Sequence, residues 1–67
     1  MAEISKIKTR IRLFNIEDGE YETIQIYDSY VWVPRSTVVK HKDIHYTVEE
    51  YSLDTSKNFL DITVIKK

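Results

Sequence analysis

Cysteine is absent from this 67-residue chain, and glycine and proline occur only once each. The absence of cysteine excludes disulfides, cysteine-based zinc sites and thiol catalysis, and it fits a reducing compartment. A single glycine, Gly19, excludes a glycine-rich phosphate-binding loop. With no linker-like stretch and no internal repeat, residues 1–67 are expected to form one small domain.

Long apolar runs are also missing. No stretch approaches the roughly 18 apolar residues of a membrane span, and the opening M-A-E-I-S-K lacks the apolar segment of a signal peptide. We therefore expect a cytoplasmic protein with no membrane association. A chain of this length buries only about 60% of the surface of its unfolded form, so its stability is thin and self-association into a homo-oligomer is a further expectation.

Neither sign of charge dominates the composition. Ten Lys and Arg face eleven Asp and Glu, which gives a net charge of −1 and argues against a strongly basic binder of polyanions. The distribution is uneven, because cations gather in the first twelve residues and acids in residues 17 to 28. Those acids could imitate phosphates toward a basic partner, although acids around a turn are usually just solvated.

Catalysis finds no support in the residues present. Ser36 has no identifiable base, the carboxylates do not point to a shared cleft, and no cofactor motif occurs. His41, Asp43 and His45 have the H-x-D-x-H spacing of metal ligands on a strand, but a turn interrupts that stretch and no fourth ligand is visible. We expect a protein that is not an enzyme and holds no metal or cofactor.

Alternation of apolar and polar residues predicts mostly strands. The first is expected from about Ile4 to Ile16, and Asp18-Gly19 is the strongest turn signal, typical of a two-residue hairpin turn. With these two residues at the centre of the turn, the strands take one register. It places Leu13 opposite Ile24, Ile11 opposite Ile26, Arg12 opposite Gln25, and Arg10 opposite Tyr27.

The rest of the chain continues this pattern. A third extended segment is expected over residues 30–33 and 36–40, bent at Pro34, with a turn at 41–43. Two further alternating segments, 44–49 and 60–65, are joined by the polar residues 54–58. Thr47 and Glu50 have capping-box spacing, so a short helix near 48–53 is the alternative to a strand there.

These elements predict an all-β domain. Five short strands in fewer than seventy residues favour a strongly bent sheet or a small barrel of SH3-like or OB-like type. An open antiparallel sheet with one short helix is the alternative architecture.

The most distinctive pattern is a cation at every second position of the first strand, which we call the basic row: Lys6, Lys8, Arg10 and Arg12. Side chains two apart share one face of a strand, at a spacing similar to the phosphate repeat of an extended single strand. In the expected register Phe14, Tyr21 and Tyr27 lie on that face and could stack on bases. The simpler interpretation is a solvated or edge-protecting strand.

A second cluster comprises Tyr30, Trp32 and Arg35. An amphipathic Trp beside a guanidinium is a common binding anchor. Because the only Trp of a small protein is more often part of the core, burial of Trp32 is the expectation and a protein-binding surface is the alternative.

The stretch Trp32-Val33-Pro34-Arg35-Ser36 resembles the W-hydrophobic-P-basic-S strand motif of small uncharacterised proteins of phages and mobile elements. In those proteins a T-V-x-x-aromatic segment follows, and 47–51 (T-V-E-E-Y) is its counterpart here. Thr37 stands where Gln is common and Tyr51 where Trp is common. The resemblance implies a mobile-element origin and a small β domain acting beside larger machinery. It supplies no catalytic or binding residues.

These patterns together predict a non-enzymatic, phage-type binding module. Its leading hypothesis is binding of single-stranded nucleic acid through the basic row and the aromatics of the first hairpin. The alternatives are a protein-interaction or inhibitory module acting on a host or phage protein, and a homo-oligomeric structural component.

Overall fold

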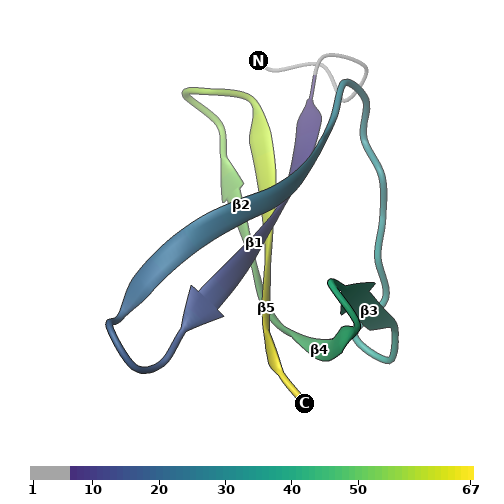
Figure 1. Cartoon of the computed structure of the whole chain (residues 1–67). Helices are drawn as coiled ribbons and strands as arrows, with labels where there is room; N and C mark the ends of the chain where they lie inside the picture. Colours follow the sequence, from purple (N-terminus) through teal and green to yellow (C-terminus); the bar gives the residue numbers. More distant parts are fainter. Residues whose placement is uncertain (1–6) are drawn as a thin grey trace.

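A computed structural model of the chain describes residues 7–67 and shows five strands (Figure 1). These are β1 (Lys8–Asn15), β2 (Glu20–Tyr27), β3 (Val38–His41), β4 (Ile44–Asp54) and β5 (Phe59–Lys66). The all-β, five-stranded prediction is confirmed. Within residues 7–67 no helix has the length and hydropathy needed to cross a membrane. Lys6 and the expected start of the first strand at Ile4 lie outside the described residues.

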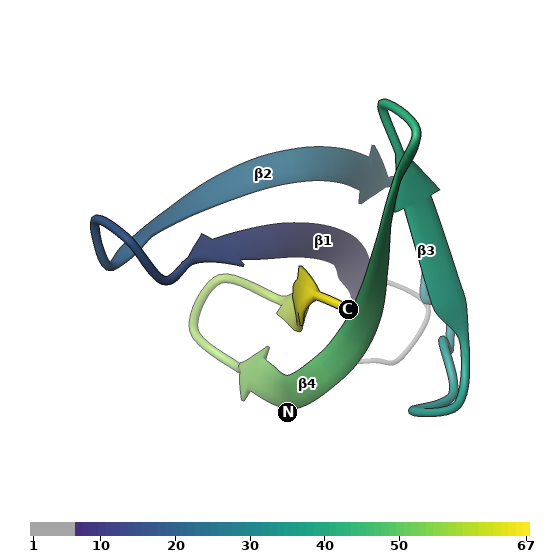
Figure 2. The same cartoon turned by 60° about the horizontal axis from the view of Figure 1, so that its bottom comes forward.

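The strands form one mixed sheet in the order β2-β1-β5-β4-β3. β1 and β5 are parallel neighbours at its centre, and the other neighbouring pairs are antiparallel. Figure 2 shows how strongly the sheet curls, with β2 and β3 as its two edges. Both edges line one hollow, because Ile24 and Tyr27 of β2 and Val39 and His41 of β3 border it. The result is a half-barrel, in agreement with the predicted small barrel-like fold.

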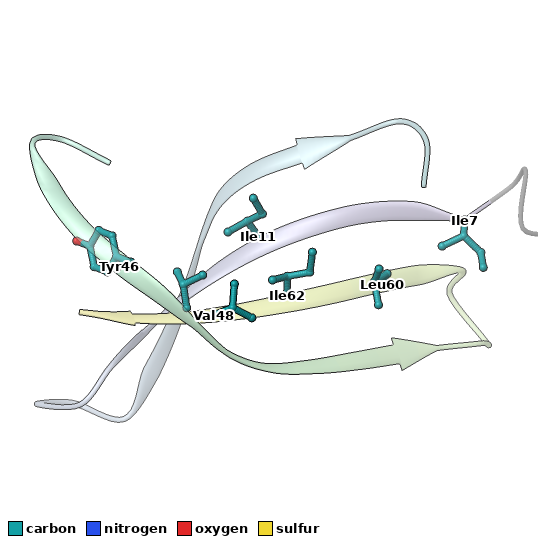
Figure 3. Packing of buried hydrophobic residues seen from close by; sticks show 7 residues of the cluster. Ile7, Ile11, Tyr46, Val48, Leu60 and Ile62 are labelled. Atoms are coloured by element: carbon teal, nitrogen blue, oxygen red, sulfur yellow. The ribbon is translucent and has the colours of Figure 1, made fainter. Parts of the chain in front are cut away.

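The core fills the concave side of this sheet. Figure 3 shows how side chains of residue 7, β1, β4 and β5 pack in this cluster. Its buried members are Ile7, Ile11, Tyr46, Val48, Leu60, Ile62 and Val64. Ile62 and Val64 are fully buried. Alternate residues of a strand share a face, so Ile7 and Ile11 lie on the core side as the sequence pattern predicted.

β5 is buried on both faces, which its alternating sequence did not indicate. The chain runs from Leu60 to Val64 without an exposed residue, and this includes Asp61 and Thr63 on the outer face. β5 lies between β1 and β4, so long side chains of its neighbours cover its outer face while the core covers the inner one.

The first hairpin forms where expected, but its predicted register is wrong. Asn15 pairs with Glu20, so residues 16–19 make a four-residue loop instead of a two-residue turn. The Gly19 amide donates to the Asn15 carbonyl at 2.8 Å, and the side-chain oxygens of Asn15 and Asp18 accept from the amides of Glu17 and Glu20. These local side-chain bonds stabilise the longer loop, as Asn and Asp commonly do in turns.

A bulge in this hairpin decides which side chains of β2 face outward. The register shifts between Ile11 and Arg12, so Arg10 pairs with Ile26 and Thr9 pairs with Tyr27. One extra residue reverses the facing of everything beyond it. Ile26 is therefore exposed on the outer face, while Tyr27 packs against the core.

Residues 47–53 are strand, so the short helix near 48–53 that was the alternative is not formed. β4 carries a bulge between Val48 and Glu50.

Strands β3 and β4 are joined by a two-residue turn. Its residues, Lys42 and Asp43, both have positive φ and lie between the paired residues His41 and Ile44. This is the mirror-image turn geometry that matches strand twist.

Residues 30–33 were expected to be a strand and are not, because side chains occupy their backbone groups. The Thr9 hydroxyl donates to the Ser29 carbonyl at 3.0 Å and accepts from the Val31 amide at 2.8 Å. The Tyr51 hydroxyl donates to the Val33 carbonyl at 2.6 Å. These bonds replace a ladder and hold the segment against β1 and β4.

The polar connection between β4 and β5 is a turn, as predicted. Asp54 accepts hydrogen bonds from the Ser56 hydroxyl and amide and from the Lys57 amide. The bond from the Ser56 hydroxyl, followed by that from the Lys57 amide, lowers the pKa of Asp54 below its ordinary value. The turn is thus stabilised by the ionised carboxylate.

Candidate functional site

The arginines of the basic row are held by a buried carboxylate from β5. Arg10 Nε lies 2.6 Å from Asp61 Oδ1, and its second terminal nitrogen lies 3.1 Å from Oδ2. Arg12 reaches the same Oδ2 at 3.9 Å. The hydrogen bond between Arg10 and Asp61 raises the pKa of Arg10 above its ordinary value. The acid that contacts both arginines therefore comes from β5 and not from the acidic residues of the first hairpin.

Aromatic rings also engage both guanidinium groups. Arg10 lies 4.7 Å from the centroid of Phe59, and Arg12 lies 4.4 Å from that of Tyr21. Phe14 lies directly opposite Tyr21, with ring centroids 5.1 Å apart. Arg10, Arg12, Phe14 and Tyr21 therefore share the outer face as predicted. Arg12 and Phe14 both contact Tyr21, whereas Arg10 contacts Phe59, which the prediction did not include.

Two parts of the nucleic-acid prediction do not agree with this geometry. Arg10 and Arg12 were expected to contact phosphates, yet Asp61 of β5 neutralises part of their charge. Tyr27 was expected on the same face, but the bulge in β2 turns it toward the core. Lys8 is exposed, and Lys6 lies outside the described residues.

The second predicted cluster is assembled as a surface. Trp32 stacks on Tyr51 with ring centroids 4.6 Å apart and planes inclined by 21°. Arg35 lies 5.5 Å from the same ring, and one of its terminal nitrogens donates to the Glu49 carbonyl at 2.6 Å. We call Trp32, Arg35 and Tyr51 the Trp32 cluster.

Trp32 is 53% exposed, so its expected burial in the core is wrong. The reason is the extended conformation of this segment, in which Trp32 and Tyr30 face outward while Val33 packs against the core. Tyr30 is 45% exposed. The Trp32 side chain is thus exposed to solvent although the backbone of both neighbouring residues, Val31 and Val33, is hydrogen-bonded to the sheet.

Tyr51 is the residue of this surface that the sequence analysis missed as a site residue. Trp32 stacks on the ring of Tyr51, and the Tyr51 hydroxyl donates to the carbonyl of Val33, the residue after Trp32. The sequence did contain a feature that could have identified Tyr51, because it is the aromatic residue of the T-V-x-x-aromatic segment. The two segments that the phage-protein resemblance singled out, 32–36 and 47–51, contact each other here.

Two buried polar atoms on the outer face have no hydrogen-bond partner among residues 7–67. They are Arg12 Nε and Thr63 Oγ1, on residues that pair across β1 and β5. Thr63 is only 2% exposed. A buried hydroxyl with no partner destabilises the folded state by about 1–3 kcal/mol.

Replacing Thr63 by Val should therefore stabilise the protein. Removing the unpartnered hydroxyl is expected to raise the free energy of unfolding by about 1 kcal/mol, measured by urea denaturation. Thr9→Val is the matched control, because the Thr9 hydroxyl is equally buried but both donates and accepts a hydrogen bond. That variant should lose about 1–2 kcal/mol, and a loss in both variants would contradict the assignment.

No family model, no curated protein and no solved structure matches this chain. Within the described part of the chain, His, Asp and Glu side chains do not gather in groups of three or more that could hold a metal ion. His41, Asp43 and His45 are accordingly not brought together as a ligand set. The Trp32 cluster and the outer face of β1 and β5 are the surfaces from which a function can be argued.

Proposed function

We propose that this protein is a non-enzymatic, protein-binding module that contacts its partner through the Trp32 cluster and Tyr30. The observation that carries the proposal is a Trp side chain that is 53% exposed and stacks on the ring of Tyr51. Trp, Tyr and Arg are the residues that most often dominate binding energy in protein interfaces. This surface presents all three within one short segment.

The rigidity of the surface supports the proposal. Ordering a side chain on binding costs about 0.5–1.5 kcal/mol, so a preoriented anchor binds more tightly than a free one. Three hydrogen bonds fix the backbone of residues 29–33 to Thr9 and Tyr51, and Arg35 is tied to the Glu49 carbonyl. A net charge of −1 also suits a protein partner better than a polyanion.

The phage-protein resemblance favours an accessory role for such a module. It implies a mobile-element origin, and in that setting the partner is a host or phage protein. Binding of single-stranded nucleic acid stays a prediction, weakened by the contacts between Asp61 and the two arginines. Self-association also stays a prediction, which the mass in solution measured by light scattering over a range of concentrations tests.

Site-specific photocrosslinking tests the proposal. A benzophenone amino acid is placed at Tyr30, beside the anchor, or at Ile26 on the outer face of β2, which is 53% exposed. In nuclease-treated extract of cells that express the protein, position 30 should yield one protein adduct and position 26 should not. Equal adducts at both positions would overturn the proposal. Loss of every partner after nuclease treatment would favour nucleic acid instead.

A further inference from the structure

A second surface on the outer side of the sheet has the features of a cation site. It is a hollow of about 290 Å³ between the first hairpin, β4 and β5. Phe14, Ile16, Tyr21 and Ile65 provide apolar walls, and Glu49 and Glu50 lie at its rim. Thr63 lines it as well. We call this the acidic hollow.

Thr63 is the feature that points to a ligand. Its neighbours Ile62 and Val64 face the core, so Thr63 projects from the opposite face of β5 into the hollow. Its hydroxyl is buried and has no hydrogen-bond partner among residues 7–67. A donor group entering the hollow would satisfy this oxygen, because buried polar atoms are rarely left without a partner.

The carboxylates make the hollow selective for positive charge. Glu50 pairs with Thr63 across β4 and β5, and Glu49 occupies the bulge beside it. Both side chains are exposed, and within the described chain neither has a cation within 4.0 Å. Two arginines lie beside these residues: Arg12 contacts Asp61 and the ring of Tyr21, and Arg35 donates to the Glu49 carbonyl. Glu49 and Glu50 thus place two carboxylates at the hollow without a paired cation among the described residues.

We propose that the acidic hollow binds an arginine side chain of the partner protein. A guanidinium group is planar and carries five N–H donors, so it can stack on an aromatic ring while it donates to carboxylates. Phe14 supplies a ring on which none of the described arginines lies, Glu49 and Glu50 supply the carboxylates, and the Thr63 hydroxyl supplies a further acceptor. The aliphatic stem of the arginine would contact Ile16 and Ile65.

The position of Glu49 links this site to the Trp32 cluster. Its carbonyl accepts from Arg35, while its residue lines the acidic hollow. The bulge at this point of β4 thus connects the two surfaces, and one partner could contact both. That the bound arginine belongs to a partner protein rests on the proposed function. The cation site itself can be tested without that partner.

A capped peptide, acetyl-Gly-Arg-Gly-amide, is the probe, and its citrulline counterpart is the neutral control. Methyl NMR of the intact protein should show saturable shifts at Ile16, Thr63 and Ile65 with a Kd of about 1 mM, within the range of weak single-group binding. The citrulline peptide should bind at least about fivefold more weakly, because a ureido group carries no charge. Equal binding of both peptides, or shifts elsewhere only, would overturn the inference.

Two double substitutions distinguish specific binding at the acidic hollow from nonspecific electrostatic attraction to the whole protein. Glu49→Gln with Glu50→Gln should weaken arginine-peptide binding at least about fivefold. Glu17→Gln with Glu20→Gln changes the net charge equally at exposed positions outside the hollow and should weaken it less than about twofold. Equal losses in the two pairs would overturn the inference.

A further variant separates this inference from the proposed function. Trp32→Ala should leave peptide binding unchanged, since Trp32 does not line the hollow. If the peptide binds the acidic hollow but position 30 captures no protein, the proposed function fails and the cation site stands. If position 30 captures a protein but the peptide does not bind, the reverse holds.

Discussion

Asp61→Asn is expected to lower the free energy of unfolding by about 2–3 kcal/mol. Asp61 is 5% exposed and serves both Arg10 and Arg12, so its neutralisation leaves two partly buried guanidinium groups without a counterion. Breaking a fully buried pair costs about 3–5 kcal/mol, and the lower figure here reflects arginine side chains that are 27% and 23% exposed. In a domain of this size the melting temperature should fall by roughly 10–20 °C.

Asp43→Asn is the matched control for this substitution. It makes the same chemical change at a side chain that is 95% exposed and lies 3.7 Å from Lys40. Exposed pairs of this kind contribute about 0–1 kcal/mol, and Asn tolerates the positive φ of this position as well as Asp does. The control should therefore melt within a few degrees of the parent protein, as followed by circular dichroism.

The outcome also decides how the basic row is understood. If Asp61→Asn were as stable as Asp43→Asn, the contacts of Asp61 would not be structural. Arg10 and Arg12 would then be available to phosphates, and the nucleic-acid hypothesis would regain its main support. A large loss of stability instead identifies the conspicuous alternation of cations in β1 as part of how this small sheet is held together.

Trp32→Ala is expected to weaken binding of the partner captured at position 30 by at least about 30-fold, since a central Trp anchor is typically worth 2 kcal/mol or more. The fold should persist, because the side chain is half exposed and its stacking on Tyr51 contributes only about 0.5–1.5 kcal/mol beyond area burial. Isothermal titration calorimetry with the identified partner measures the affinity, and circular dichroism confirms the fold.

Ile26→Ala is the control for lost apolar surface. Ile26 has the same exposed fraction as Trp32 but lies on the outer face of β2, so its removal should change the affinity less than about threefold. Trp32→Phe keeps an aromatic ring over Tyr51 and should restore part of the affinity. Equal effects of Trp32→Ala and Ile26→Ala would show that the Trp32 cluster is not the contact surface.

The candidate surfaces show which side-chain positions could be predicted from local sequence patterns and which could not. Alternation placed Arg10, Arg12, Phe14 and Tyr21 on one face, because facing within one strand depends only on a repeat of two residues. The same reasoning failed at Tyr27, where one bulged residue reverses the facing. The expected burial of Trp32 had a different basis, the usual place of a lone Trp in the core, and it failed because exposure depends on how a non-strand segment is tied to the sheet.

The sequence by itself determined that the protein is all-β, which side of β1 is apolar, and where most turns lie. These properties follow from alternation and turn residues over a few positions. The tertiary structure alone decided that β5 is the parallel neighbour of β1, which brings Asp61 to Arg10 across 51 positions of the chain. It also decided that Tyr51 supports Trp32. Strand order depends on the packing and pairing of the whole sheet, and no short stretch of residues contains that information.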